Sequence, residues 1–274
     1  MNNKICLLRT LKMLPIFFIV FDSCYLFGIS PSTTDIKNNK VYTSEGCRTS
    51  YKISVVPQYS RVCQSAKQMP KEKGNVYGID MEFECQKKND LYVDLLALFN
   101  YGRLNGSIPA HIKEIVGKGA FGYSFFWGCY EHQWVLSSYA GFGYRLLVNH
   151  FLESVPPWSS MRIHYHNYFI PIGFKLQHNF SCNWKIGFNG LFMPSVTQML
   201  YVCRVKGTLW KQSRSPSYEV EVPVTWINSY SKYKIEISLV PFYKHWVLGS
   251  SKVLSFPTWR QNYWGIGLQY SHNF

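Results

Sequence analysis

The sequence predicts an all-β fold: an antiparallel up-and-down transmembrane β-barrel of about ten strands, with eight as the alternative count. Polar and apolar residues alternate along about ten segments, as in strands whose two faces meet different surroundings. Connections between these segments alternate between short and long, which a barrel produces when tight turns lie on one side and long loops on the other. Aromatic residues make up 18% and charged residues only 16% of the 274 residues, whereas about a quarter of an average soluble domain is charged.

The last segment shows the alternation best. Between Tyr263 and Phe274, every second residue counted back from the end is large, and those between are mostly small or polar. A strand of this kind presents one apolar face and one polar face. A membrane barrel requires such a division, because its outer band meets lipid and its lumen is polar.

This ending resembles the terminal motif of bacterial outer-membrane β-barrels, a C-terminal Phe preceded by aromatic or aliphatic residues at alternating positions. The matching residues are Ile266, Leu268, Tyr270 and Phe274, and His272 departs from the pattern. The resemblance implies a location in the cell outer membrane and recognition by the barrel-insertion machinery. It does not identify a subfamily.

The N-terminus has the layout of a secretory signal peptide. Lys4, Arg9 and Lys12 precede a short apolar run over 13–21, as in signals whose core is too short to be a stop-transfer helix. We therefore expect a signal over 1–27, a flexible periplasmic leader over 28–46, and the barrel over 47–274. The sequence does not fix the position of the cleavage site. Acylation of Cys24, as in a lipoprotein, and an uncleaved anchor are the alternatives.

Alternation and turn residues place the ten strands. They are expected at roughly 48–58, 75–85, 91–101, 113–127, 133–148, 161–176, 183–192, 218–228, 233–246 and 262–274. Tight turns are expected at 86–90, 128–132, 177–182 and 229–232, and long loops at 59–74, 102–112, 149–160, 193–217 and 247–261. Because proline lacks the N–H that a ladder needs, bulges are expected at Pro57, Pro171, Pro223 and Pro241.

Parity along the strands places most mid-strand charges on one face. Leu91, Val93 and Leu95 then face lipid and Asp94 faces inward. A basic residue on the lipid face costs about 2–4 kcal/mol at the midplane, so the charges are expected in the lumen as an ion-pair plug. The inward set is Lys52, Asp80, Glu82, Glu84, Asp94, Lys118, Arg145, Lys175, Lys185, Glu221, Lys234, Glu236 and Lys244.

Six cysteines lie beyond the signal and leader. Cys47, Cys85, Cys129 and Cys182 flank the tight turns, and Cys63 and Cys203 lie in expected long loops. In an oxidising compartment Cys63 could bridge to Cys203, and the inner four could pair as Cys47 with Cys85 and Cys129 with Cys182. Connectivity cannot be read from sequence, and the four inner cysteines allow three pairings. Free thiols and intermolecular disulfides remain open. No CxxC spacing occurs, so no metal site and no cofactor are expected.

The net charge of +14 is concentrated partly in the first and fourth long loops. The residues are Arg61, Lys67, Lys71, Lys73, Arg204, Lys206, Lys211 and Arg214. On an outer surface these loops meet anionic lipopolysaccharide before any nucleic acid. We therefore expect outer-membrane lipid and lipopolysaccharide as partners, no nucleic acid, and a monomer; solubility alone is the alternative explanation.

A structural, surface-interaction or narrow-pore role is the expected function, without enzymatic activity. The first alternative is an omptin-like or lipid-acting outer-membrane hydrolase. Omptin proteases resemble this architecture, and Asp80, Glu82 and Glu84 with His164 and His166 would supply acids and bases, but the Asp-His dipeptide of that family is missing. Lipid A deacylases and the phospholipase barrel use a Ser with a His and a carboxylate or amide, but no Ser is tied by motif to the pairs His178-Asn179 or His272-Asn273. The second alternative is a secreted soluble β-sandwich that binds glycans.

Overall fold

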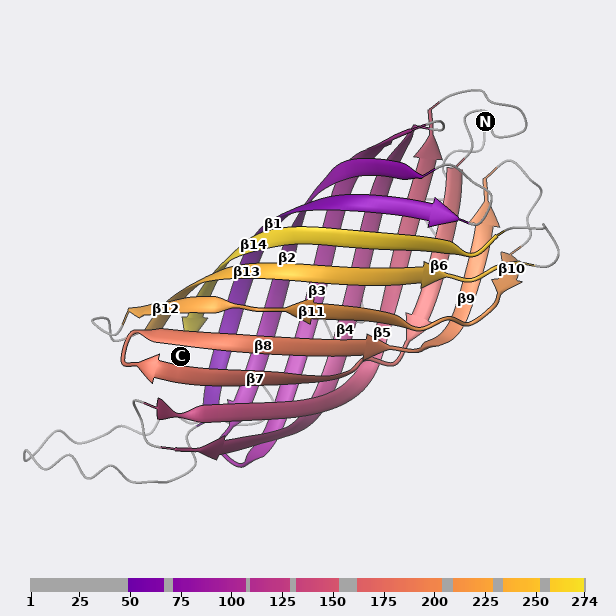
Figure 1. Cartoon of the computed structure of the whole chain (residues 1–274). Coiled ribbons are helices and arrows are strands. Elements are labelled where there is room, and N and C mark those ends of the chain that lie inside the picture. The colour runs from indigo at the N-terminus through magenta and orange to yellow at the C-terminus, as the bar shows by residue number, and fades with distance from the viewer. Residues whose placement is uncertain are drawn as a thin grey trace, which may run out of the picture. The chain divides into compact units, whose positions relative to one another are not determined.

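The computed structural model describes residues 49–66, 71–106, 109–128, 132–152, 162–203, 209–228, 234–251 and 257–273. Within them the fold is an antiparallel barrel of ten strands (Figure 1). The elements are β1 Thr49–Ala66, β2 Glu72–Lys87, β3 Asp90–Asn105, β4 Ala110–Trp127, β5 Trp134–Phe151, β6 Arg162–Phe169, β7 Ile172–Ser181, β8 Trp184–Met193, β9 Ser195–Val202, β10 Leu209–Gln212, β11 Ser217–Glu221, β12 Val224–Asn228, β13 Lys234–Leu248 and β14 Trp259–Asn273.

Three of the ten barrel strands are interrupted and so carry more than one label. The sixth is β6 with β7, because both pair with β5. The seventh is β8 with β9, which pair with β7 and β6 respectively. The eighth is β10, β11 and β12, along β9 and β8.

The barrel closes where the first strand meets the last. β1 pairs with β14 from Lys52 opposite Asn273 to Ala66 opposite Trp259. Closure leaves no strand edge to be satisfied in lipid. A soluble sandwich of two stacked sheets is therefore wrong, and the expected barrel is confirmed. No helix of the described residues is long and apolar enough to cross a membrane.

The two ends of the barrel are named here by their connections. At the turn end β2 is followed by β3, β4 by β5, β7 by β8 and β12 by β13, and at the loop end β1 is followed by β2, β3 by β4, β5 by β6, β9 by β10 and β13 by β14. Strands reach further toward the loop end than expected. β1 continues to Ala66, and β9 and β10 occupy part of the expected loop 193–217. The strands remain paired there, although outward residues such as Arg61 and Arg103 are no longer apolar. The alternation of apolar and polar residues therefore ends in the sequence before the strands end.

Prolines account for the interruptions in part. Where bulges were expected at Pro171 and Pro223, the structure has breaks in the strands, and Pro194 adds a third break. Their carbonyls still accept hydrogen bonds, for example from Gly141 N to Pro171 O at 3.0 Å. The bulges expected at Pro57 and Pro241 are absent, since the β1–β2 and β13–β14 registers run through them without a shift.

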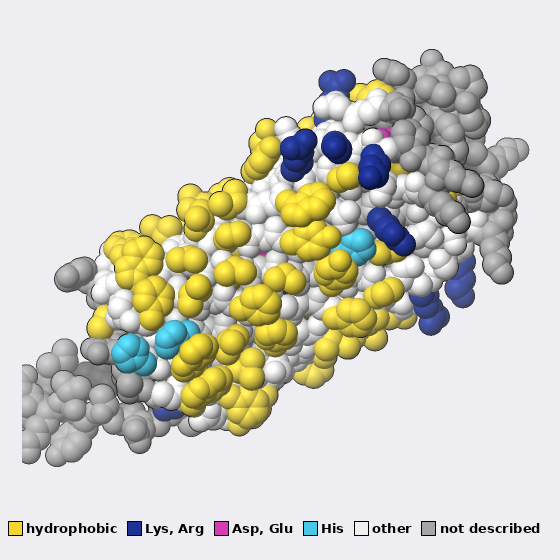
Figure 2. Space-filling view, in the orientation of Figure 1, with side chains coloured by type: hydrophobic (Ala, Val, Ile, Leu, Met, Phe, Trp, Pro, Cys, Tyr) yellow, Lys and Arg dark blue, Asp and Glu magenta, His cyan; other side chains and the backbone are white. Residues whose placement is uncertain are grey.

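The outer wall carries a belt of exposed apolar side chains, and Figure 2 shows it spreading over the middle of one face. The belt includes Ile79, Met81, Leu91, Phe99, Phe121, Phe142, Phe188, Leu239, Ile266 and Leu268. Residues between them point inward and are largely buried, as Asp80 and Leu98 are. An apolar exterior around a polar and packed interior is the arrangement of a membrane-spanning barrel.

Candidate functional site

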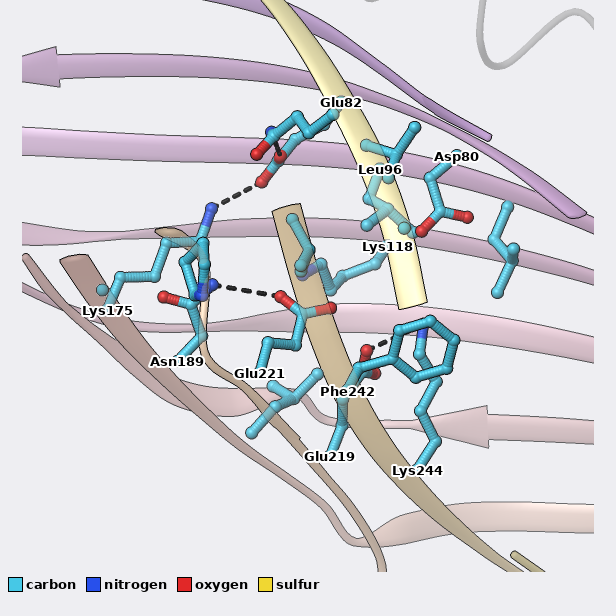
Figure 3. Close-up of a pocket in the computed structure, with 18 of the residues that line it drawn as sticks. Asp80, Glu82, Leu96, Lys118, Lys175, Asn189, Glu219, Glu221, Phe242 and Lys244 are labelled. Carbon is cyan, nitrogen blue, oxygen red and sulfur yellow. Dashed lines mark hydrogen bonds and ion pairs between the residues drawn. The ribbon is translucent and has the colours of Figure 1, made fainter. Parts of the chain in front are cut away.

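The lumen is the site that parity predicted, and a small cavity lies in its middle. The cavity has a volume of about 90 Å³. Lys52, Lys118, Lys175, Lys185 and Lys244 supply its amines, and Asp80, Glu82, Glu84, Glu219 and Glu221 its carboxylates. Figure 3 shows several of these side chains converging from opposite walls.

Lys175 is the centre of the largest group of ion pairs. Its Nζ lies 2.5 Å from Glu82 Oε1, 3.2 Å from Glu84 Oε2 and 3.8 Å from Asp94 Oδ2. Asp94 also pairs with Lys118, at 3.0 Å. The cation comes from β7 and the three carboxylates come from β2 and β3. β7 is a neighbour of neither β2 nor β3 in the sheet. The group therefore connects two parts of the wall through the lumen.

Further contacts complete the polar half of the lumen. Lys185 Nζ lies 2.6 Å from Glu236 Oε2, and Lys244 Nζ lies 2.8 Å from Glu219 Oε1. Two other acids are bonded to amides: Asn189 donates to Glu221 at 3.0 Å and Gln58 donates to Asp80 at 3.1 Å. Buried charges that are paired and hydrogen-bonded in this way are tolerated, whereas isolated ones are not.

The loop half of the lumen is filled differently: a cluster of apolar side chains lies there beside buried amides such as Gln64, Asn149 and Gln198. The buried cluster is Val62, Val76, Leu98, Leu104, Ala110, Ile112, Val116, Leu147, Phe151, Ile163, Tyr165, Phe169, Met193, Leu200, Val202, Trp210, Phe242, Trp246, Leu248, Trp259 and Tyr263. We call this set the apolar plug. Phe169 and Trp246 pack edge to face within it, with ring centres 5.5 Å apart.

One ion pair lies among these apolar residues. Arg145 is fully buried, and its Nε donates to Glu114 Oε1 at 2.5 Å. Its Nη2 donates to Gln261 Oε1 at 2.7 Å. Arg145 was in the predicted inward set, but Glu114 and Glu219, which pair with predicted cations, were not. Their parity in the expected strands was the signal that would have found them.

The structure places the predicted inward charges as follows. Asp80, Glu84, Asp94, Arg145, Lys175, Glu236 and Lys244 are buried, and Lys52, Glu82, Lys118, Lys185 and Glu221 are half-buried in the lumen. Lys234 is exposed at the turn end of β13.

The apolar plug was not expected. Its signal in the sequence was a loss of alternation, as in Leu146, Leu147 and Val148, where both faces of the strand are apolar.

The acids and histidines of the hydrolase alternative lie on opposite faces of the wall. Glu82 faces the lumen, whereas His164 and His166 alternate with the buried Ile163 and Tyr165 and so face outward. Tyr144 Oη lies 2.8 Å from His166 Nδ1. Within the described residues, no cluster of three or more His, Cys, Asp or Glu side chains is arranged to hold a metal ion.

The cysteines are only partly described. Cys47 and Cys129 lie outside the described residues, so their expected pairs with Cys85 and Cys182 stay predictions. The structure does not show the expected bridge between Cys63 and Cys203. β1 and β9 are not neighbours in the sheet, and Cys203 Sγ instead lies 3.4 Å from His164 Nε2.

The terminal motif faces the membrane as far as it is described. Ile266, Leu268 and Tyr270 are exposed on the outer face of β14, with exposed fractions of 43%, 55% and 49%. Phe274 lies outside the described residues, as do the predicted signal and leader.

No protein-family model and no curated protein matches this sequence. Solved structures match it in fold. The outer membrane protease OmpT from Escherichia coli has a TM-score of 0.47 at 7% identity, over 82% of this chain and 96% of that one. The translocator domain of the autotransporter NalP from Neisseria meningitidis has a TM-score of 0.41 at 8% identity, over 79% and 88%. Neisserial surface protein A has a TM-score of 0.30 at 10% identity, over 79% and 95%.

This chain is similar to these proteins in fold alone. The strand pairing of this chain confirms the expected antiparallel β-barrel, and the subfamily stays unidentified.

Proposed function

We propose that this chain is a monomeric, non-conducting barrel of the outer membrane, with a structural role in the envelope and a loop end available for surface contacts. The filling of the lumen carries the proposal. The polar half of the lumen, toward the turn end, is crossed by ion pairs around Lys175, and the loop half is occupied by the apolar plug. A solute would have to displace both.

The size of the barrel supports the same function. Barrels with about 8 strands enclose space that side chains fill, whereas aqueous channels appear with about 16–18 strands. The cavity of about 90 Å³ is small beside the roughly 300–1,000 Å³ of ligand pockets. Of the three expected roles, the geometry therefore favours a structural or surface role over a narrow pore.

The membrane location is supported by the distribution of side chains on the wall. Apolar residues are exposed outward while acids and lysines at alternate positions point inward, as Met81 and Glu82 do on β2. Recognition by the barrel-insertion machinery is part of the proposal and is supported by the outward row Ile266, Leu268 and Tyr270.

The test combines two measurements on the full-length chain refolded in detergent. On a gel, unboiled protein is expected to migrate faster than boiled protein, because a closed barrel stays compact until heated. In a planar bilayer the same preparation is expected to give no discrete conductance steps. Reproducible steps from protein that shows the heat shift would overturn the non-conducting role, and full solubility without detergent would overturn the membrane location.

A further inference from the structure

A row of three arginines, two histidines and one asparagine crosses six neighbouring strands near the loop end. Direct register pairs join its members in sequence: Arg61 with Asn75, Asn75 with Arg103, Arg103 with His111, His111 with His150, and His150 with Arg162. We call Arg61, Asn75, Arg103, His111, His150 and Arg162 the basic row. Only Arg61 belonged to a basic loop identified in the sequence.

The row faces away from the lumen. Arg61, Arg103 and Arg162 are exposed, and the residues that follow them, Val62, Leu104 and Ile163, are fully buried. Other outward cations flank the row: Lys73 on β2, Lys113 on β4 and Arg260 on β14 are exposed. Figure 2 shows basic side chains gathered toward the end of the barrel at which β10 lies.

Among the described residues, the outer wall offers Arg61, Arg103 and Arg162 no acidic partner. Every described Asp and Glu except Asp90 occupies an inward-facing strand position. Asp90 lies at the other end of the barrel, where it pairs with Lys87. Within the described part of the chain, no salt bridge involves Arg61, Arg103 or Arg162. The described acids other than Asp90 thus lie on the lumen side, and the three exposed arginines can meet an external anion.

Aromatic rings fix the depth of the row relative to a membrane. Tyr59, Tyr77 and Tyr101 lie two positions from the row on β1, β2 and β3, on its membrane side. Trp264 is the register partner of Arg61. Tyr59 and Tyr77 are in contact, with ring centres 5.4 Å apart. Because Tyr and Trp rings lie at the level of the lipid headgroups, the cations just beyond them lie where lipid phosphates lie.

We propose that the basic row binds the phosphate groups of a phosphorylated glycolipid, the lipid A portion of lipopolysaccharide, in the leaflet at the loop end. The proposal rests on the proposed membrane location and adds a binding site to it. The guanidinium groups of Arg61, Arg103 and Arg162 have the planar geometry that matches phosphate oxygens. Spacing across adjacent strands, about 4.8 Å apart, lets one headgroup reach several members of the row.

The experiment measures lipid A binding to the refolded full-length chain by native mass spectrometry, with phosphatidylcholine as the lipid without net charge. The triple variant Arg61→Gln, Arg103→Gln and Arg162→Gln is expected to bind lipid A on the order of tenfold to a hundredfold more weakly. The matched control Lys88→Gln removes an exposed cation from the turn between β2 and β3 and is expected to bind as the parent does. Unchanged binding by the triple variant, or equal losses in the control, would overturn the site.

Two further arms separate the causes. Inorganic phosphate at lipid-equivalent concentration is expected not to compete; full competition would show a free-anion site and overturn the commitment to lipid. If the triple variant does not show the heat shift, the parent chain is used instead, and its binding must weaken steeply with salt, because exposed charges are screened. A parent chain that is heat-modifiable and non-conducting yet binds no lipid A would refute the basic row alone. Absence of the heat shift in the parent would refute the proposed function itself.

Discussion

The guanidinium carbon of Arg145 lies 4.2 Å from the centre of the Trp246 ring, inside the loop half of the lumen. Arg145 comes from β5 and Trp246 from β13, so one cation contacts two separate parts of the wall. Its hydrogen bond to Glu114 satisfies the charge, and the ring covers its face. This contact joins the ionic and the apolar filling of the lumen.

Removal of the Arg145 charge is expected to destabilise the barrel strongly. The Arg145→Met variant leaves Glu114 buried without its cation, which typically costs about 3–5 kcal/mol. Urea unfolding in detergent, followed by the heat-shift gel, measures the loss. The double variant Arg145→Met with Glu114→Gln is expected to recover most of it, since the orphaned charge is gone. Equal stabilities of the single and double variants would contradict this account.

Lys175 is expected to be the most sensitive lysine of the polar half. The Lys175→Met variant leaves Glu82 and Glu84 without their shared cation and Asp94 with Lys118 alone. A loss of about 3–5 kcal/mol in unfolding free energy is expected. Lys52→Met is the matched control, because Lys52 lines the same cavity and no salt bridge is found for it among the described residues. If both variants lose the same stability, the ion pairs of Lys175 are not what holds the two parts of the wall together.

The sequence could predict the barrel and its polar lumen because both depend on a period of two. Side chains such as Met81 and Glu82 alternate between lipid and lumen along a whole strand, and a single chain shows that pattern. Ion-pair partners could not be predicted in the same way. Lys175 and Glu82 are far apart in the chain, and only the closed register brings them together.

The apolar plug and the strand ends could not be predicted for a different reason. Where the lumen is apolar, residues such as Leu146 and Leu147 are apolar on both faces of the strand, so the period of two disappears. Where the strands extend past the lipid, outward residues become basic, as at Arg61 and Arg103, and the same pattern is lost. Prolines were ambiguous because their effect depends on the neighbouring strand: Pro241 accepts a hydrogen bond from Val222 at the break in the eighth strand.

Opening the apolar plug is expected to produce conductance where the parent chain has none. The double variant Phe169→Ala and Trp246→Ala removes two rings that are in contact within the loop half. In a planar bilayer it is expected to show discrete steps or flickering, since water can then enter the vacated space. The control Phe121→Ala removes a ring from the outer wall and is expected to stay silent. A silent double variant with an intact heat shift would place the barrier to conduction in the ion-pair network instead.

Adjacent positions on β14 offer a direct test of which face meets lipid. Leu268 is 55% exposed on the outer wall and Gln269 is 7% exposed in the lumen, where its Nε2 donates to Glu82 Oε2 at 3.3 Å. A lysine on the lipid face near the midplane is expected to cost about 2–4 kcal/mol, so Leu268→Lys should unfold at distinctly lower urea than the parent. Gln269→Lys should lose less, because Glu82 neutralises the new charge. The comparison is made on protein refolded into lipid vesicles, and the reverse order of stability would mean that lipid does not contact the face on which Leu268 lies.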